Sequence, residues 1–433
     1  MLLERNLMRN LIDWRSGKKR KPLILEGARQ VGKTYILEEF GRRYYKNTVY
    51  VNMENASGEI KALFSDSIDP KKIIAALELM SGMKIRPDDT LIFFDEIQEL
   101  PRALTSLKYF YESCPQYNLV SSGSLLGLFI HAGTSFPVGK VDFLHLEPMN
   151  FEEFLIASGQ EKLVEQTKND GQPLLTAPLK EQLNYYLVTG GMPEVVASWI
   201  ESRDLKSVEK IQNSILLAYL HDFSKHTAGM MATRIRQVWE SLASQFAKRG
   251  NKFIYGLIKE GARAREYELA IQWLVDSGVV RKVYRVDRGD RLPLEAYKDV
   301  NAFKLYFVDV GLFRHLAKIP ASVILNKNAI FDEFNGLIAE QYVLQELAPR
   351  KLFFWDSGAA SEVDFVVQLD EKIVPIEVKS GENVKAKSLR VYRDKFRPEV
   401  SIRFSLKDFH FRDGLFNIPL YMSFVFNRIV GEV

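Results

Sequence analysis

Short apolar runs alternate with amphipathic stretches along the first third of the chain. The amphipathic stretches have the spacing of helices, and the apolar runs have the length of strands that are buried on both faces. Strands and helices that alternate in this way form a parallel sheet with helices on its faces. The pattern therefore predicts an α/β fold. The predicted strands are Pro22–Glu26, Thr48–Asn52, Thr90–Asp95, Asn118–Ser122 and Phe143–Leu146.

A glycine-rich segment joins the first predicted strand to a helix predicted over Tyr35–Tyr44. It reads G-x-x-x-x-G-K-T, the pattern of a phosphate-binding P-loop. Glycines let the backbone turn its N–H groups toward phosphate oxygens, and the following helix adds its positive end. Lys33 is expected to reach the outer phosphates, and Thr34 to give its hydroxyl to Mg²⁺. The predicted nucleotide-binding residues of this segment are Gly27, Ala28, Arg29, Gln30, Val31, Gly32, Lys33 and Thr34.

Two acidic residues, Asp95 and Glu96, follow the four apolar residues of the third predicted strand. This order fits a buried parallel strand that brings carboxylates to its C-terminal end. Asp95 is expected to hold Mg²⁺, and Glu96 to orient or deprotonate the attacking water. After the fourth strand, Ser124 is a candidate polar sensor of the terminal phosphate. The segments together predict nucleotide binding and hydrolysis, with Lys33 and Glu96 as the catalytic residues.

The pattern changes after Asn150. The stretch up to Thr227 is mainly helical, with breaks at Gly171–Pro178 and Gly190–Pro193, and we interpret it as a helical lid over the nucleotide. Three helices and two strands then follow, an order typical of a winged helix. A winged helix can bind DNA or serve as a protein contact, and its arginines are compatible with phosphate contacts. The predicted elements are the helices Arg234–Lys248, Ile254–Glu260 and Arg265–Ser277 and the strands Val279–Val286 and Lys304–Val310.

Two strands with alternating polarity are predicted near the C-terminus, at Glu362–Leu369 and Ile373–Lys379. If Asp370 and Glu371 form the turn between them, Asp364 lies opposite Glu377, and Glu362 lies opposite Lys379. Two carboxylates that face one another repel, unless a cation lies between them.

A third carboxylate, Glu340, falls on the apolar face of the helix predicted over Phe334–Leu347. An acid on a helix, an acid on one strand and E-x-K on the next are typical of restriction-endonuclease-like nucleases. In such a site Glu340, Asp364 and Glu377 would bind Mg²⁺, and Lys379 would position or activate the attacking water. The alternative is a solvated hairpin with salt bridges, with Glu340 turned toward solvent.

The composition is that of a globular protein of 433 residues, for which two to four domains are expected. The single cysteine, Cys114, excludes an internal disulfide, and one cysteine with six histidines disfavours a structural zinc site. The N-terminus lacks the apolar core of a signal peptide, and no apolar run approaches the length of a membrane span. We expect a cytoplasmic protein without membrane contact. A net charge of +4 permits contact with nucleic acid without requiring it.

Motifs spread along nearly the whole chain occur at Gly27–Thr34, Phe93–Gln98, Ser122–Ser124, Leu146–Phe154, Gly190–Pro193, Lys304–Leu312, Glu362–Phe365 and Ile376–Ser380. Together they resemble the motifs of bacterial and archaeal AAA-type ATP-binding proteins that carry a poorly characterised C-terminal domain. The resemblance implies a P-loop ATPase module joined to a winged helix and an endonuclease-like domain, and ATP rather than GTP as the nucleotide. One departure is Lys140, where relatives often have an arginine; a lysine supplies charge there without the bidentate fork.

The predicted organisation is an AAA-type P-loop core over residues 1–149, a helical lid over 150–230, a winged helix over 231–320 and a small endonuclease-like α/β domain over 321–433. The predicted function is Mg²⁺-dependent ATP hydrolysis that drives a conformational change in C-terminal domains associated with nucleic acid, DNA rather than RNA. One alternative is an ATP-regulated, metal-dependent nuclease. Another is a nucleotide-gated switch that binds a protein or DNA without turnover. The oligomeric state and the identity of any arginine finger stay open.

Overall fold

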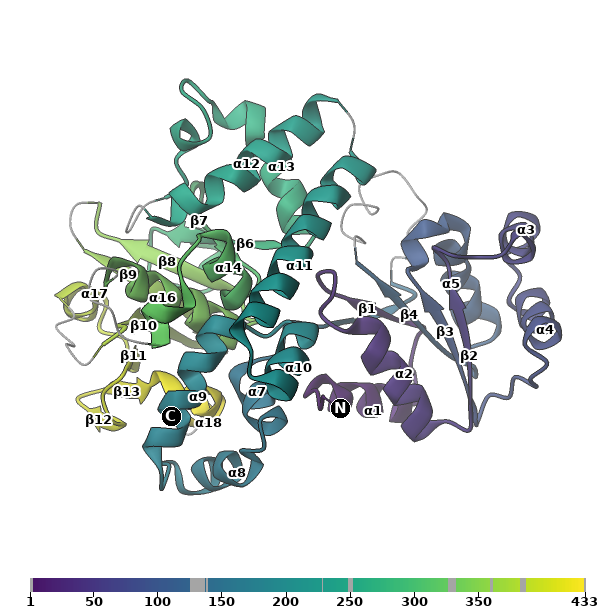
Figure 1. Ribbon diagram of the computed structural model, residues 1–433, viewed down its shortest axis with the longest axis horizontal. Coiled ribbons are helices and arrows are strands. Elements are labelled where there is room, and N and C mark those ends of the chain that lie inside the picture. Colours follow the sequence, from purple (N-terminus) through teal and green to yellow (C-terminus); the bar gives the residue numbers. More distant parts are fainter. Residues whose placement is uncertain are drawn as a thin grey trace. The chain divides into compact units, whose positions relative to one another are not determined.

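Figure 1 shows the computed structural model, which describes residues 3–124, 137, 139–227, 229–247, 252–325, 332–358, 361–381 and 387–431. The chain forms two compact units. One comprises Glu4–Glu147 and Asp276–Val279, and the other comprises Met1–Leu3, Pro148–Val275 and Val280–Val433. The division after Glu147 lies beside the predicted end of the first domain. The segments predicted as lid, winged helix and endonuclease-like domain fall within the other unit, except for Asp276–Val279.

The N-terminal unit is built on a five-stranded sheet in which every neighbouring pair of strands is parallel, in the order β2-β3-β4-β1-β5. The predicted parallel α/β fold is therefore confirmed for this unit. Every residue of β3 is buried, as expected for a strand covered on both faces. The strands are β1 (Leu23–Glu26), β2 (Asn47–Asn52), β3 (Thr90–Asp95), β4 (Asn118–Gly123) and β5 (Asp142–His145).

Helices connect β1 to β2, β2 to β3 and β3 to β4 (Figure 1). Apolar side chains of α3, α4 and α5 form a buried core with those of the strands. The helix after β1 begins at Lys33, two residues earlier than predicted, because the last residues of the P-loop already form its first turn. A 3₁₀ turn, η1 (Ile97–Glu99), follows β3. The helices are α1 (Leu7–Ser16), α2 (Lys33–Tyr44), α3 (Gly58–Asp66), α4 (Pro70–Ser81) and α5 (Pro101–Ser113).

The C-terminal unit begins with the predicted helical stretch. The predicted break at Gly171–Pro178 is shorter than expected, because the next helix already starts at Thr176 and accommodates Pro178 in its first turn. No helix in the described ranges is both long and apolar enough to cross a membrane. The helices of this stretch are α7 (Phe151–Ala157), α8 (Glu161–Asp170), α9 (Thr176–Thr189), α10 (Pro193–Ser202) and α11 (Leu205–His226).

The predicted break at Gly190–Pro193 is set by a buried aspartate. Asp309 accepts hydrogen bonds from the backbone N–H of Gly191 at 2.6 Å and of Leu312 at 2.8 Å. A Cβ on Gly190 would lie 2.1 Å from the Asp309 carboxylate, and one on Gly191 would lie 1.9 Å from the carbonyl oxygen of Met149. The two glycines are therefore required where the α9–α10 turn meets the N-terminus of α14 (Val310–Leu316).

The rest of this unit consists of an eight-stranded mixed sheet and further helices. The strand order of the sheet is β12-β13-β11-β10-β9-β8-β6-β7. Its strands are β6 (Val280–Val286), β7 (Lys298–Phe307), β8 (Leu352–Asp356), β9 (Glu362–Leu369), β10 (Lys372–Val378), β11 (Ser401–Ser405), β12 (His410–Arg412) and β13 (Leu415–Pro419). Its further helices are α12 (Met230–Ala247), α13 (Ala264–Asp276), α15 (Ala321–Leu325), α16 (Asp332–Leu347), α17 (Lys387–Phe396) and α18 (Phe426–Gly431), with 3₁₀ turns η2 (Tyr255–Leu257), η3 (Leu294–Tyr297) and η5 (Leu420–Val425).

The elements predicted for a winged helix are present only in part. Helices α12 and α13 and the β6–β7 hairpin occur in the expected order, but the second predicted helix is the single turn η2, and the last strand ends at Phe307 because Val310 starts α14. Lys248, the predicted end of the first helix, lies outside the described residues. The hairpin also joins the C-terminal sheet, since β6 pairs with β8 in parallel. Residues 231–320 are therefore not separated from the segment that follows.

The predicted C-terminal hairpin is confirmed. Strands β9 and β10 pair antiparallel with Leu369 opposite Lys372, and the register continues to Phe365 opposite Ile376. Asp370 takes a positive φ of 50° in the turn. Asp364 and Glu377 are the next residues along the two strands. The hairpin therefore brings these carboxylates close to one another.

Candidate functional site

The P-loop of the N-terminal unit curls between β1 and α2. Gly27 has a φ of +148°, and a Cβ there would lie 2.3 Å from the carbonyl oxygen of Leu146. Gly32 and Gln30 also have positive φ values, of 93° and 66°. Only glycine fits the crowded first position, and the curled backbone supplies the cradle that a nucleotide phosphate needs. The predicted residues Gly27–Gly32 thus form a loop that leads directly into α2, where Lys33 and Thr34 form the first turn; Val31 in the loop is buried.

A buried arginine that the sequence did not point to fixes the base of this loop. Arg5 donates to the carbonyl oxygen of Val31 at 2.9 Å and to that of Glu147 at 2.5 Å. It therefore ties the loop to the segment after β5. A single arginine near the N-terminus carries no local signal of this role.

Lys33 lies inside the loop and is 5% exposed. Its ammonium group donates to the carbonyl oxygens of Gly27 at 3.0 Å and Ala28 at 2.8 Å. Burial lowers the pKa of Lys33 to about 8, although the nearby carboxylates of Glu96 and Asp95 act in the opposite direction. A buried cation at the centre of a cradle of amides is suited to bind an anion.

Asp95 accepts hydrogen bonds from three hydroxyl groups at the end of β3. Thr34 Oγ1 lies 3.0 Å from its Oδ2 and 3.2 Å from its Oδ1, the hydroxyl of Tyr50 lies 2.9 Å from Oδ2, and Ser122 Oγ donates to Oδ1. Thr34 and Asp95 are thus brought together as predicted, whereas Tyr50 and Ser122 were missed. A hydroxyl and a carboxylate beside a phosphate cradle are the oxygen ligands that Mg²⁺ prefers, so these residues fit the ion.

Glu96, the residue after Asp95, has a positive φ of 49°, which turns its side chain away from the strand direction. Gln98 Nε2 donates to its Oε2 at 2.6 Å, and Ser124 Oγ lies 3.2 Å from its Oε1. The predicted sensor Ser124 therefore contacts the predicted base directly. Gln98 ends the motif Phe93–Gln98, but no role was predicted for it, because a polar residue after an acidic pair is ordinary turn composition.

Lys140, the departure from the related proteins, pairs with Glu112 at 3.2 Å and lies 5.3 Å from the ring centre of Tyr111. Its charge is therefore partly neutralised within the unit. Phe136 and Val138, in the same segment, lie outside the described residues.

A second group of polar side chains lies in the C-terminal unit, between α16 and the sheet. Glu340 comes from α16, Asp364 from β9 and Glu377 from β10, as predicted. Lys379 Nζ lies 2.5 Å from Glu377 Oε1, and the backbone N–H of Val378 donates to Asp364 at 2.7 Å. The structure thus brings the four predicted residues into one neighbourhood, which we call the acidic cluster together with Glu362.

Burial raises the pKa of each predicted carboxyl group in the cluster, and repulsion from neighbouring carboxylates adds to it for Glu340 and Glu377. Burial, and then the charge of Asp364, raise the pKa of Glu340 to about 7 and that of Glu377 to about 8. The pKa of Asp364 is raised by burial, against the opposing charges of Lys304 and Lys379. Buried carboxyl groups with raised pKa values are typical of sites that bind a cation.

The side chains of the acidic cluster do not have the arrangement of metal ligands. Within the described ranges, no three histidine, cysteine, aspartate or glutamate side chains are arranged to hold a metal ion. The ligand set Glu340, Asp364 and Glu377 therefore stays a prediction. One atom, Glu377 Oε2, is buried without a hydrogen-bond partner.

Two residues of β7 that the sequence reasoning missed complete this neighbourhood. Lys304 forms an ion pair with Glu362, and the hydroxyl of Tyr306 donates to Glu340 at 3.2 Å. A lysine in a strand that otherwise reads as buried was the available signal, since buried lysines need a partner.

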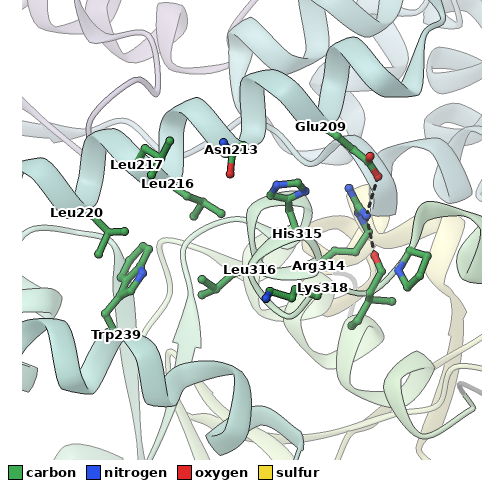
Figure 2. A pocket seen from close by; sticks show the side chains of 12 residues that line it. Glu209, Asn213, Leu216, Leu217, Leu220, Trp239, Arg314, His315, Leu316 and Lys318 are labelled. Carbon is green, nitrogen blue, oxygen red and sulfur yellow. Dashed lines mark hydrogen bonds and ion pairs between the residues drawn. The ribbon is translucent and has the colours of Figure 1, made fainter.

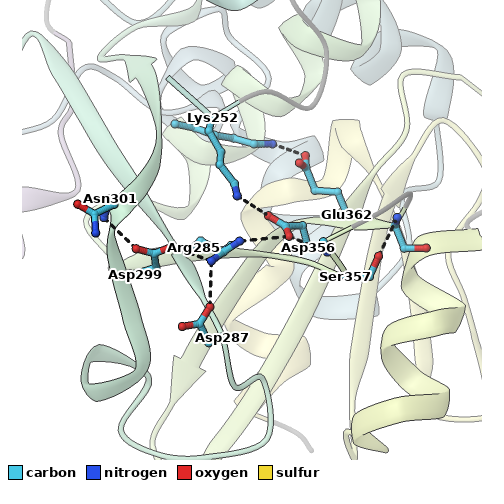
Figure 3. A network of polar contacts seen from close by, with 11 residues as sticks. Lys252, Arg285, Asp287, Asp299, Asn301, Asp356, Ser357 and Glu362 are labelled. Atoms are coloured by element: carbon cyan, nitrogen blue, oxygen red, sulfur yellow. Dashed lines mark hydrogen bonds and ion pairs between the residues drawn. The ribbon is translucent and has the colours of Figure 1, made fainter. Parts of the chain in front are cut away.

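Arg285, one of the candidate phosphate-contacting arginines, is committed to internal ion pairs. It lies 2.7 Å from Asp299, 3.2 Å from Asp287 and 3.5 Å from Asp356 (Figure 3). Because these acids come from β7 and β8 as well as the turn after β6, the arginine connects the hairpin to the sheet.

A groove between α11, α12 and α14 has a volume of about 460 Å³ (Figure 2). Leu220 and Trp239 give it apolar walls. Arg314 lines it but is only 1% exposed; it donates to the carbonyl oxygen of Ile319 at 2.7 Å and pairs with Glu209 at 3.6 Å. This guanidinium is therefore bonded within the protein, while the polar side chains of Asn213, His315 and Lys318 also line the groove.

Comparison with known proteins adds three family matches. Residues 19–155 match the family described as an AAA domain. Residues 180–323 and 335–422 match two families, each described as a domain of unknown function. No curated protein matched the chain.

Several solved structures are similar to this chain. A Walker-type ATPase of Pyrococcus abyssi is 14% identical, with 73% of this chain and 96% of that one covered and a TM-score of 0.47. Cdc6p of Pyrobaculum aerophilum is 12% identical, with 75% and 96% covered and a TM-score of 0.27. A mutant of RuvB from Thermotoga maritima is 14% identical, with 64% and 88% covered and a TM-score of 0.27.

The AAA-domain match covers the parallel sheet, the P-loop and the acidic residues at the end of β3. Residues 19–155 are therefore similar to an AAA domain over the same residues that form the P-loop and the group around Asp95.

Proposed function

We propose that the protein binds ATP with Mg²⁺ at the P-loop and hydrolyses it. The observation that carries the proposal is the hydrogen-bonded group around Asp95, where Thr34, from the P-loop helix, meets the ends of β3 and β4. This group combines the hydroxyl and the carboxylate that P-loop ATPases use for Mg²⁺. When bound, the ion would neutralise charge on the phosphate oxygens.

Four side chains at the nucleotide site contribute to hydrolysis in different ways. Lys33 stabilises the negative charge that develops on the outer phosphates, and its buried position strengthens that interaction. Glu96 accepts a proton from the attacking water or orients that water. Gln98 and Ser124 hold the Glu96 carboxylate, so they set the direction in which it faces.

We further propose that turnover changes the conformation of the C-terminal unit, and that this unit acts on nucleic acid, DNA rather than RNA. The presence of a compact C-terminal unit with its own polar cluster supports this coupling. The change would be a population shift driven by the different affinities of ATP and ADP for two states.

A second candidate function is metal-dependent cleavage of nucleic acid at the acidic cluster. It is favoured by one observation, the buried Glu377 with an unpartnered oxygen beside Lys379. In this reading Glu340, Asp364 and Glu377 hold the metal ion, and Lys379 positions the attacking water.

The first experiment is phosphate release from ATP by the purified full chain, with and without Mg²⁺. Lys33→Ala and Asp95→Ala are expected to reduce turnover to background, and Lys61→Ala, an exposed lysine on α3, serves as the control. Wild-type turnover no faster than that of the two variants contradicts the ATPase. Tight ATP binding with no turnover would instead identify the nucleotide-gated switch.

The second candidate is tested on a panel of single-stranded, double-stranded and branched DNA and RNA, with Mg²⁺ or Mn²⁺ and with or without ATP. Cleavage that disappears in Glu377→Ala/Lys379→Ala but persists in Lys33→Ala supports a nuclease site in the C-terminal unit. Absence of cleavage by the wild type across the panel contradicts it.

A further inference from the structure

Strand β7 places a lysine inside the acidic cluster, although this strand precedes the segment that carries the other members. Lys304 is 7% exposed and forms an ion pair with Glu362. Tyr306, two residues further along, donates to Glu340. Residues two apart lie on the same face of a strand, so both side chains of β7 are directed at the cluster.

The charges of the cluster do not balance. Four carboxyl groups, those of Glu340, Glu362, Asp364 and Glu377, interact with the ammonium groups of Lys304 and Lys379, and Glu377 also interacts with the guanidinium group of Arg403. If all of these groups are ionised, the formal charge is −1. The excess is negative, so it attracts a further cation.

A neighbouring acid, Asp356, also acts on the cluster, because its charge contributes to the raised pKa of Glu362. Asp356 is opposite Glu362 in the pairing of β8 and β9, but it lies 3.5 Å from Arg285 and 3.6 Å from Lys252 (Figure 3). Its charge is therefore partly balanced by groups that do not belong to the cluster.

Two of the carboxylates in the cluster are oriented by ion pairs with lysines. Glu362 faces Lys304, and Glu377 faces Lys379. Within the described part of the chain, no three acidic side chains converge as a metal ion requires. Glu377 Oε2 meanwhile has no hydrogen-bond partner. The carboxylates of the cluster are therefore oriented by ammonium groups. The oxygen Glu377 Oε2 could accept a further cation.

We propose that Lys304 is an internal cation that competes with a divalent metal ion for the acidic cluster, so that the metal binds only when the lysine leaves Glu362. A positive charge within a few ångströms of a buried site repels an incoming cation strongly, because the screening by water is weak there. The inference rests on the second candidate function insofar as the carboxylates attract a metal ion. It adds that β7 regulates this site from outside the C-terminal segment.

The test is calorimetric titration of Mn²⁺ into the full chain, with every protein carrying Asp95→Asn to remove the metal site of the P-loop. Lys304→Met is expected to bind Mn²⁺ at least about tenfold more tightly than the parent, because one repelling charge is gone. Lys304→Arg keeps the charge and should bind like the parent. Lys298→Met, which removes a lysine of the same strand that pairs with Glu295 instead, is the matched control.

Two further variants keep the test decisive. Lys304→Gln removes the charge but keeps a hydrogen-bond donor for Glu362, so it replaces the methionine variant if that protein unfolds. Adding Glu377→Gln to Lys304→Met should abolish the gain, which locates the metal in the cluster.

Mn²⁺ binding by Lys304→Met that is equal to or weaker than that of the parent overturns the proposal, and so does an equal gain in Lys304→Arg. Absence of Mn²⁺ binding in all the variants overturns it as well. The nuclease is judged separately by DNA cleavage: tighter metal binding without cleavage supports the role of Lys304 and contradicts the nuclease.

Discussion

Asp95 shows how single side chains define the nucleotide site at the residue scale. Its two oxygens accept from the hydroxyls of Thr34, Tyr50 and Ser122, which come from α2, β2 and β4. A carboxylate held in this way has little rotational freedom. It can therefore bind a cation with little free-energy cost of reorganisation. Thr34 and Asp95 could be predicted from motifs, whereas Tyr50 and Ser122 act only through the folding of distant strands.

Gly27→Ala tests whether the curled backbone of the loop is required. A Cβ would meet the carbonyl oxygen of Leu146 at 2.3 Å, and the φ of +148° is strained for any residue with a side chain. A shift of the cradle that costs about 1.4 kcal/mol would weaken nucleotide binding about tenfold. Gly58→Ala, where a Cβ meets nothing within 4 Å, is the matched control. Fluorescent-nucleotide titration measures the difference, and equal affinity of the two variants would argue against the cradle.

The elements of the C-terminal unit are joined by buried polar groups that no local pattern predicts. Glu346 of α16 accepts from the backbone N–H of Phe151 in α7 at 2.8 Å and from the hydroxyl of Ser423 in η5 at 2.9 Å. The helix α16 itself was predictable from its apolar spacing. Its partners were not, because they lie far away in sequence.

Glu346→Gln tests this junction through pH. Burial raises the pKa of Glu346 to about 8, so the folded chain keeps a proton that the unfolded chain loses above its ordinary pKa near 4.5. The free energy of unfolding should therefore fall as pH rises from about 5 to 8 and level off above. Because one pKa unit corresponds to about 1.4 kcal/mol, the glutamine variant should be more stable than the wild type at pH 8 by a few kcal/mol at most.

Denaturant unfolding from pH 5 to 9 measures this effect, with the exposed Glu165→Gln of α8 as the control. A glutamine variant that keeps the full pH slope of the wild type would show that Glu346 is not its source.

At the scale of the whole molecule, the positions of the strands along the chain were easier to predict than the way in which the strands pair. The strands of the parallel sheet and the β9–β10 hairpin were predicted within one or two residues, because burial on two faces and period-two alternation are local signals. That β6 pairs with β8 was not predictable, since the pairing joins Tyr284 to Phe353 across a long stretch of chain. The position of Lys304 in its strand was a local signal, but its partner Glu362 lies far away in sequence.

The assembly predicts which fragments fold. A fragment of residues 321–433 lacks β6 and β7, which would expose the edge of β8 and the buried ring of Trp355 that packs with Val286. We expect it to aggregate or to unfold without cooperativity, whereas residues 148–433 should unfold as one cooperative unit. Thermal unfolding followed by circular dichroism distinguishes them. A cooperative transition in the shorter fragment would contradict the shared sheet.

Single-turnover hydrolysis by Glu96→Gln is the most direct test of the ATPase. Glutamine keeps the size of the side chain and its contact with Ser124 but cannot take a proton, so ATP affinity should stay near that of the wild type while the rate of phosphate release falls by about 10²–10⁴-fold. Glu59→Gln, exposed on α3, controls for the loss of one charge. A rate equal to that of the wild type would show that Glu96 does not activate water and would contradict the proposed hydrolytic site.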